Sequence, residues 1–113
     1  MQAPQSAMLL RIYTEEGRQE GHKPLYEAIV LRARELGLAG ATVLRGPMGF
    51  GKSHAIHTAK IVDISAKLPL VIEIVDSADK IRLMVQALEG MRNIGLVTTE
   101  KVEVVRYGAG PDA

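Results

Sequence analysis

The sequence predicts an α+β fold in which two helices cover one face of an antiparallel sheet. Apolar, strand-like runs, such as residues 8–13 (MLLRIY) and 70–75 (LVIEIV), are separated by two segments whose apolar residues recur at helical spacing. The predicted order is β-α-β-β-β-α-β. Without its short middle strand, this order is the split β-α-β pattern of the ferredoxin-like fold.

The first part of the chain predicts a strand, a helix and a second strand. A polar loop over 14–23 follows the strand at 8–13. A helix is predicted over 24–36, because proline is tolerated in a first helical turn and Gly37 suits a C-terminal cap. Its apolar stripe consists of Leu25, Ala28, Ile29, Ala33 and Leu36. The second strand is predicted over 41–45 (ATVLR).

The second part predicts a short strand, a long strand, a helix and a last strand. Residues 58–64 (TAKIVDI) form the short strand, and 70–75 have the strongest strand pattern in the chain. Ser77 is a favourable N-cap, and the helix after it is predicted to end at Gly95. The apolar stripe of this helix is Ile81, Met84, Val85, Leu88 and Met91. The last strand is predicted over 102–107 (VEVVRY).

Length and composition predict one globular domain over residues 8–107, with flexible tails at 1–7 and 108–113. The net charge of +1 gives no overall field that would attract nucleic acid or membrane. There is no cysteine, which excludes disulfides and thiolate chemistry. No apolar run is long enough to span a membrane, and the first residues lack signal-peptide features, so we expect a cytoplasmic protein.

The sheet face away from the helices is predicted to be partly apolar. It would carry Leu9, Arg11, Tyr13, Val71, Glu73 and Val75, together with either Val102 and Val104 or Val105 and Tyr107. Isolated charges among apolar neighbours favour burial against another copy of the chain, with Glu73 paired to Arg11 or Arg106. An exposed face with scattered valines is the alternative.

Residues 45–60 (RGPMGFGKSHAIHTAK) are the most distinctive segment. Within them, residues 46–53 match G-x-x-x-x-G-K-[ST], the phosphate-binding loop of nucleotide hydrolases. Such a loop leads from a strand into a helix. Its lysine contacts the outer phosphates of the nucleotide, and its serine binds the magnesium ion. The residues after Ser53 are rich in β-branched side chains and show no helical pattern. A hydrolase or kinase that uses Lys52 and Ser53 therefore stays an alternative.

We expect this segment to bind an anion without hydrolysing it. Glycines let the backbone approach a ligand, and Arg45, Lys52 and Lys60 supply positive charge. The candidate binding residues are Arg45, Gly46, Gly49, Phe50, Gly51, Lys52, Ser53, His54 and His57. A loop whose glycines only form turns is the alternative.

No metal site and no catalytic group are predicted. His54 and His57 have no nearby carboxylate or thiol to complete a metal ligand set. No serine, cysteine or carboxylate constellation for catalysis is evident, and Glu15, Glu16 and Glu100 are expected to be solvated. We also expect the glycine-rich segment to be mobile in the absence of a ligand.

Several segments resemble a known family in combination: LLRIY, GHKPLYEAIVLRARELGLAGATVLRGPMGFG, HTAKI, LPLVIEIVDS and VEVVRY. They are similar to the PII-like family of unknown function, the domain-of-unknown-function family one hundred and ninety, from about Met8 to Tyr107. This family is related to the nitrogen regulatory PII signal-transduction proteins. The resemblance implies a ferredoxin-like fold, a homotrimer and adenine nucleotides bound in clefts between subunits. It also makes residues 45–57 the counterpart of the PII loop that contacts partner proteins.

The chain departs from PII proteins at two places. Residues 90–101 lack the Gly-Asp-Gly-Lys-type turn that precedes the last PII strand, and Phe50 is the only aromatic residue of a loop that carries a modifiable tyrosine in PII. We expect the protein to be a trimeric, non-catalytic regulator. Its loop would bind either an anionic small molecule, such as an adenine nucleotide, or a partner protein. A metal-binding trimer of the copper-tolerance type, which shares the fold, is a further alternative.

Overall fold

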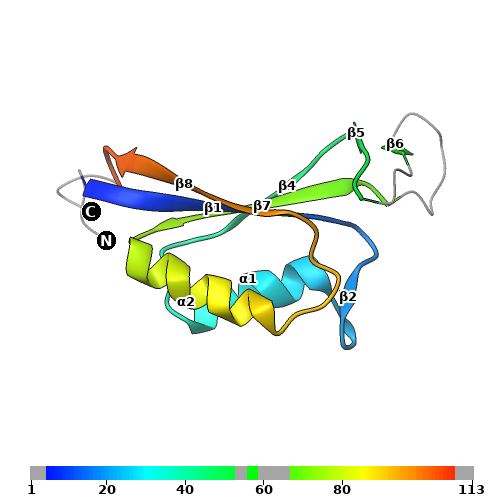
Figure 1. Cartoon of the computed structure of the whole chain (residues 1–113), viewed down its shortest axis with the longest axis horizontal. Helices are drawn as coiled ribbons and strands as arrows, with labels where there is room; N and C mark the ends of the chain where they lie inside the picture. The colour runs from blue at the N-terminus through cyan, green and yellow to red at the C-terminus, as the bar shows by residue number, and fades with distance from the viewer. Residues whose placement is uncertain (1–4, 53–55, 59–66, 109–113) are drawn as a thin grey trace.

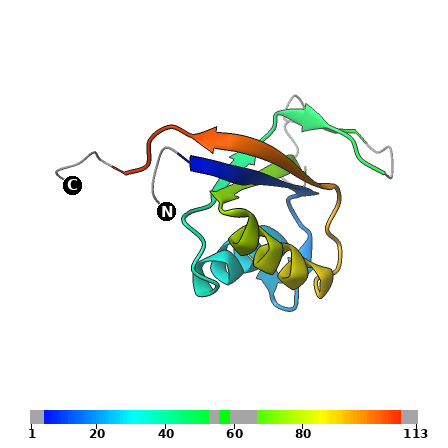
Figure 2. The ribbon, with the colours of Figure 1, turned by 60° about the vertical axis from the view of Figure 1, so that its left-hand side comes forward.

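The computed structural model describes residues 5–52, 56–58 and 67–108. Four long strands form one antiparallel sheet in the order β4-β7-β1-β8, and both helices pack on the same face of it (Figures 1 and 2). This arrangement confirms the predicted ferredoxin-like fold. The elements are β1 (Gln5–Glu15), β2 (Gln19–Glu20), β3 (Lys23–Pro24), α1 (Leu25–Glu35), β4 (Thr42–Arg45), β5 (Met48–Gly49), β6 (His57–Thr58), β7 (Pro69–Asp76), α2 (Ala78–Glu89) and β8 (Val97–Val104).

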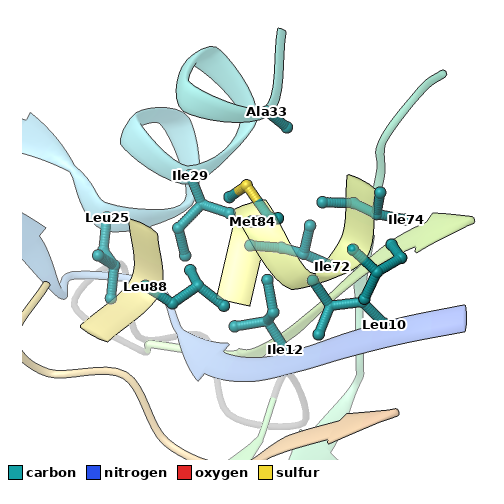
Figure 3. Packing of buried hydrophobic residues seen from close by; sticks show 10 residues of the cluster. Leu10, Ile12, Leu25, Ile29, Ala33, Ile72, Ile74, Met84 and Leu88 are labelled. Carbon is teal, nitrogen blue, oxygen red and sulfur yellow. The ribbon is translucent and has the colours of Figure 1, made fainter. Parts of the chain in front are cut away.

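The core lies between the two helices and the central strands β1 and β7. Strand β7 alternates half-buried and buried residues along its whole length, as expected of a strand with one covered face. Every fourth residue of α1 contributes to the same core, in accordance with helical spacing. Figure 3 shows these side chains meeting between the layers; the buried cluster comprises Leu10, Ile12, Leu25, Ile29, Ala33, Ile72, Ile74, Ile81, Met84 and Leu88.

Helix α1 begins and ends close to the predicted residues. Pro24 precedes it with φ of −56°, and Leu25 is the first helical residue. At the other end Gly37 adopts a positive φ of 78°, which lets the chain reverse. The Leu38 N–H then donates to the Ala33 carbonyl over 3.0 Å, so the helix has a glycine-dependent C-terminal cap.

Helix α2 starts as predicted, because the Ser77 hydroxyl accepts a hydrogen bond from the Lys80 N–H. The predicted end at Gly95 is wrong, since the helix ends at Glu89 and Gly90 is its C-cap. Gly95 serves instead as a point of close approach. Its N–H donates to the Tyr13 carbonyl over 3.1 Å, and a Cβ on it would lie 2.6 Å from that oxygen.

The prediction for the last strand is also wrong in its bounds. Strand β8 runs from Val97 to Val104, whereas residues 102–107 were expected. Among the described strands it pairs with β1 alone and forms an edge of the sheet. Most of its residues are therefore exposed, and its apolar alternation is weak. The hairpin β2–β3 forms at the end of the predicted polar loop and includes Pro24, which was expected to begin the helix. Of the short strand predicted over 58–64, Thr58 belongs to β6 and residues 59–64 lie outside the described residues.

Candidate functional site

The glycine-rich segment leaves the sheet at the end of β4 and returns as a hairpin. The Gly46 N–H donates to the Pro69 carbonyl over 2.8 Å, which fastens the start of the segment to β7. Beyond this point β5 pairs with β6, with Met48 opposite Thr58 and Gly49 opposite His57. Figure 1 shows this hairpin beyond one end of the sheet, on the side away from the helices. The segment is therefore available to a ligand or a neighbouring molecule.

Two of the predicted glycines lie against Pro69. A Cβ at Gly46 or at Gly49 would lie 3.2 Å or 3.1 Å from the Pro69 Cγ, closer than an ordinary contact. Around a third glycine, Gly51, the described part of the chain places no atom within 4 Å of the Cβ position, apart from the two neighbouring residues. Gly46 and Gly49 thus allow the backbone to pass close to the start of β7, which is a packing role that the sequence pattern alone does not reveal.

An ion pair lies at the base of the hairpin. Arg45 is the last residue of β4, and its Nη1 is 3.4 Å from Glu16 Oε2. The Arg45 side chain is 62% exposed and that of Glu16 is 33% exposed. Glu16 is itself anchored to the residue before β7, because its Oε1 accepts from the Leu68 N–H over 3.2 Å and its own N–H donates to the Leu68 carbonyl over 2.9 Å.

Of the other predicted binding residues, some are described in full, one by its backbone alone, and two lie outside the described residues. Phe50 is 64% exposed and Lys52 is exposed. Ser53 and His54 lie outside the described residues, and for His57 only the backbone of β6 is described. The structure therefore places Gly46 and Gly49 against Pro69 just after Arg45, with His57 paired to Gly49 through the backbone.

The nucleotide-hydrolase alternative expects a helix after the glycine motif. In the described residues, β5 lies inside the motif and β6 follows four residues after it. A hairpin does not present the helix N-terminus on which such a loop relies. Within the described part of the chain, no group of three histidine, cysteine, aspartate or glutamate side chains is placed to hold a metal ion.

A second feature is an open groove of about 480 Å³ on the helix-free face, which the sequence did not predict. Its walls come from Ala39–Thr42, Glu73, Val75, Val102–Val104, Arg106 and Tyr107. The Tyr107 hydroxyl donates to the Ala39 carbonyl over 2.9 Å, and the Ala39 N–H donates to Asp76 Oδ2 over 2.8 Å. The segment after β8 is thereby joined to the segment that enters β4.

The helix-free face has the mixed character that was predicted. Arg11 Nε lies 2.9 Å from Glu73 Oε2, which confirms one of the two expected pairs, and Arg11 Nη1 lies 3.5 Å from Glu100 Oε1. The hydrogen bond from Arg11 to Glu73 raises the pKa of Arg11 above its ordinary value. In register, Val102 is opposite Ala7 and Val104 is opposite Gln5, so this valine pair, rather than Val105 and Tyr107, belongs to the paired part of β8. No described helix is both long and apolar enough to cross a bilayer.

The fold is that of the PII-like proteins. A solved structure described as a putative PII-like signaling protein from Thermus thermophilus superimposes on this chain with a TM-score of 0.63 and 17% identity. The match includes 88% of this chain and 90% of the Thermus chain. The PII-like protein CPII from Thiomonas intermedia, bound to ADP and bicarbonate, covers 90% of this chain and 91% of its own, with a TM-score of 0.59 and 21% identity.

The family follows from the sequence comparisons. The family model DUF190, described as an uncharacterized ACR, matches residues 7–104. A UPF0166 protein of Aquifex aeolicus is 42% identical over 97 residues, which cover 86% of this chain and 91% of that protein. A UPF0166 protein of Methanocaldococcus jannaschii is 33% identical over 92 residues, covering 80% and 84%. The chain therefore belongs to the DUF190 family, and the predicted resemblance is confirmed.

Proposed function

We propose that this chain is a non-catalytic PII-like regulator whose hairpin base binds the phosphate groups of an adenine nucleotide. The observation that carries the proposal is an exposed guanidinium, that of Arg45, at the last residue of β4, where the chain turns into the glycine-rich hairpin. A planar guanidinium binds phosphate oxygens in pairs. CPII, which shares the fold, is bound to ADP and bicarbonate, and this supports the choice of ligand.

The regulator is proposed to be a homotrimer that buries the helix-free face of each sheet. Tyr13, Val71 and Leu44 are in register across β1, β7 and β4 and form an apolar row on that face. Tyr13 is 36% exposed and Leu44 is 48% exposed in the single chain. Association would remove this row from water and also cover the Arg11–Glu73 pair.

A partner protein is proposed to contact the hairpin. Its described residues carry apolar side chains that face solvent: Met48, Phe50 and Ile56 are each at least 60% exposed. Exposed apolar groups on a projecting hairpin are typical of a surface that another protein covers. Because Arg45 and the hairpin are adjacent in sequence, a nucleotide on Arg45 would alter the start of the surface that the partner reads.

The test is thermal unfolding of the purified protein with ADP, ATP, AMP and bicarbonate, together with a nucleotide turnover assay. A ligand that binds the folded state at 100 times its dissociation constant stabilises it by about 2.7 kcal/mol. We expect an adenine nucleotide to raise the unfolding temperature and to be recovered unchanged. Turnover of ATP that is lost in Lys52→Ala would instead support the phosphate-loop alternative.

A further inference from the structure

The carboxylate of Glu16 is held in place independently of Arg45. Its Oε1 accepts from the Leu68 N–H, and the Glu16 N–H and the Leu68 carbonyl form a second bond between the same two residues. These bonds join the end of β1 to the residue before β7. The remaining oxygen, Oε2, faces Arg45 Nη1 at 3.4 Å. An anionic oxygen is therefore fixed beside the guanidinium.

Arg45 is held less firmly than Glu16. Among the described residues, Glu16 is the partner that the structure gives to the Arg45 guanidinium. The pair is long, and both side chains reach solvent. Exposed ion pairs of this kind contribute little, because water and salt screen them and both side chains lose freedom. A phosphate group, with more charge and two oxygens in reach of the guanidinium, is able to displace the carboxylate.

We propose that Glu16 is a built-in competitor that occupies Arg45 in the ligand-free chain and is displaced by a phosphate-bearing ligand. The inference rests on the proposed function, since it assigns a determinant of affinity to the same site. Because the backbone bonds to Leu68 retain Glu16, the group that moves on binding is Arg45. The Arg45 side chain then leaves Glu16, while the backbone at the end of β4 stays fastened to β7 by the bond from the Gly46 N–H to the Pro69 carbonyl.

The experiment compares Glu16→Gln with Glu15→Gln by titration calorimetry with ADP at low salt. Both variants remove one negative charge near the end of β1, but Glu15 pairs with Arg18, at 3.0 Å, whereas Glu16 pairs with Arg45. A glutamine at position 16 keeps an oxygen for the Leu68 N–H, so the strand ends stay joined. Exposed pairs have coupling energies that correspond to about 1.4- to 5-fold in a binding constant. We expect Glu16→Gln to bind ADP about two- to fivefold more tightly than the wild type, and Glu15→Gln to remain near the wild-type value.

The variant Arg45→Ala separates competition from other effects. In the Arg45→Ala background, Glu16→Gln is expected to give no gain, because the competitor has lost its target. An equal gain from both glutamate variants would show a general charge effect and would overturn the inference. Unchanged or weaker ADP binding by Glu16→Gln would also overturn it, while leaving the proposed function intact. If neither the wild type nor Glu16→Gln binds ADP, the proposed function fails and the inference fails with it.

Discussion

Replacement of Val71 by aspartate should dissociate the proposed trimer without unfolding the chain. Val71 is half-buried in the centre of the helix-free face, between Tyr13 and Leu44, and does not belong to the buried cluster beneath the helices. In the single chain the new carboxylate would reach water. In the trimer it would be buried without a cation in register with it, since the cross-strand neighbours of Val71 are tyrosine and leucine.

The loss of trimer stability is the sum of three equal costs, because each of the three chains would bury one unpaired carboxylate. Burying an unpaired charge costs several kcal/mol, and about 3 kcal/mol per chain is a conservative value. The concentration at half-dissociation of a trimer scales with the square root of its dissociation constant. A total of about 9 kcal/mol therefore raises that concentration by roughly three orders of magnitude. A trimer that is stable at nanomolar concentration in the wild type would be half-dissociated near micromolar concentration in the variant.

Light scattering after size-exclusion chromatography measures this shift directly across a dilution series. Leu83→Asp is the matched control, because Leu83 is an exposed apolar residue on α2, away from the helix-free face. We expect the control to stay trimeric across the dilution series, and Val71→Asp to change from trimer to monomer near micromolar concentration with unchanged circular dichroism. A wild-type monomer at micromolar concentration, or a Val71→Asp protein that stays trimeric, would refute burial of this face.

Two further predictions concern the stability of the fold. The Ile72 side chain is fully buried between β7 and the helices. Ile72→Ala should therefore lower the free energy of unfolding, measured by denaturant titration, by about 2–5 kcal/mol. A loss below about 1 kcal/mol would contradict the described core. Gly95→Ala should lower the free energy of unfolding by about 1–3 kcal/mol, because the added Cβ meets the Tyr13 carbonyl oxygen. Gly51→Ala should change it by less than about 0.5 kcal/mol. Equal effects at the two glycines would contradict the close approach of Gly95 to Tyr13.

The fold was predictable where the local pattern and the tertiary environment agree. Strand β7 is covered by helices on one face and flanked by strands on both edges, so its apolar alternation is strong. Strand β8 lies at an edge with most residues exposed, and Thr98 and Thr99 carry no apolar signal. Helix α2 shows a different limit. Met91 continues the apolar stripe and packs on the core, but it does so from beyond the helix end at Glu89.

The candidate site was predictable only in part. Arg45 and the glycines could be proposed from the sequence because the motif that holds them is contiguous. Glu16 was expected to be solvated. Its contacts with Arg45 and Leu68 span 29 and 52 residues, so they leave no local pattern from which the sequence could have predicted them. The link between Tyr107 and Ala39 spans 68 residues and was missed for the same reason. Contacts of this kind depend on strand register, which the chain order alone does not specify.

The measurement that tests the central claim most directly is the affinity of Arg45→Ala for ADP, by titration calorimetry against the wild type. Arg32→Ala is the matched control, because Arg32 is an exposed cation on α1 that pairs with Glu35, away from the hairpin. Loss of a charged hydrogen bond to phosphate should cost about 1.5–3 kcal/mol, which is roughly a 10- to 150-fold loss of affinity. We expect that loss in Arg45→Ala and wild-type affinity in Arg32→Ala. Equal ADP binding by Arg45→Ala and the wild type would contradict a nucleotide site at the hairpin base.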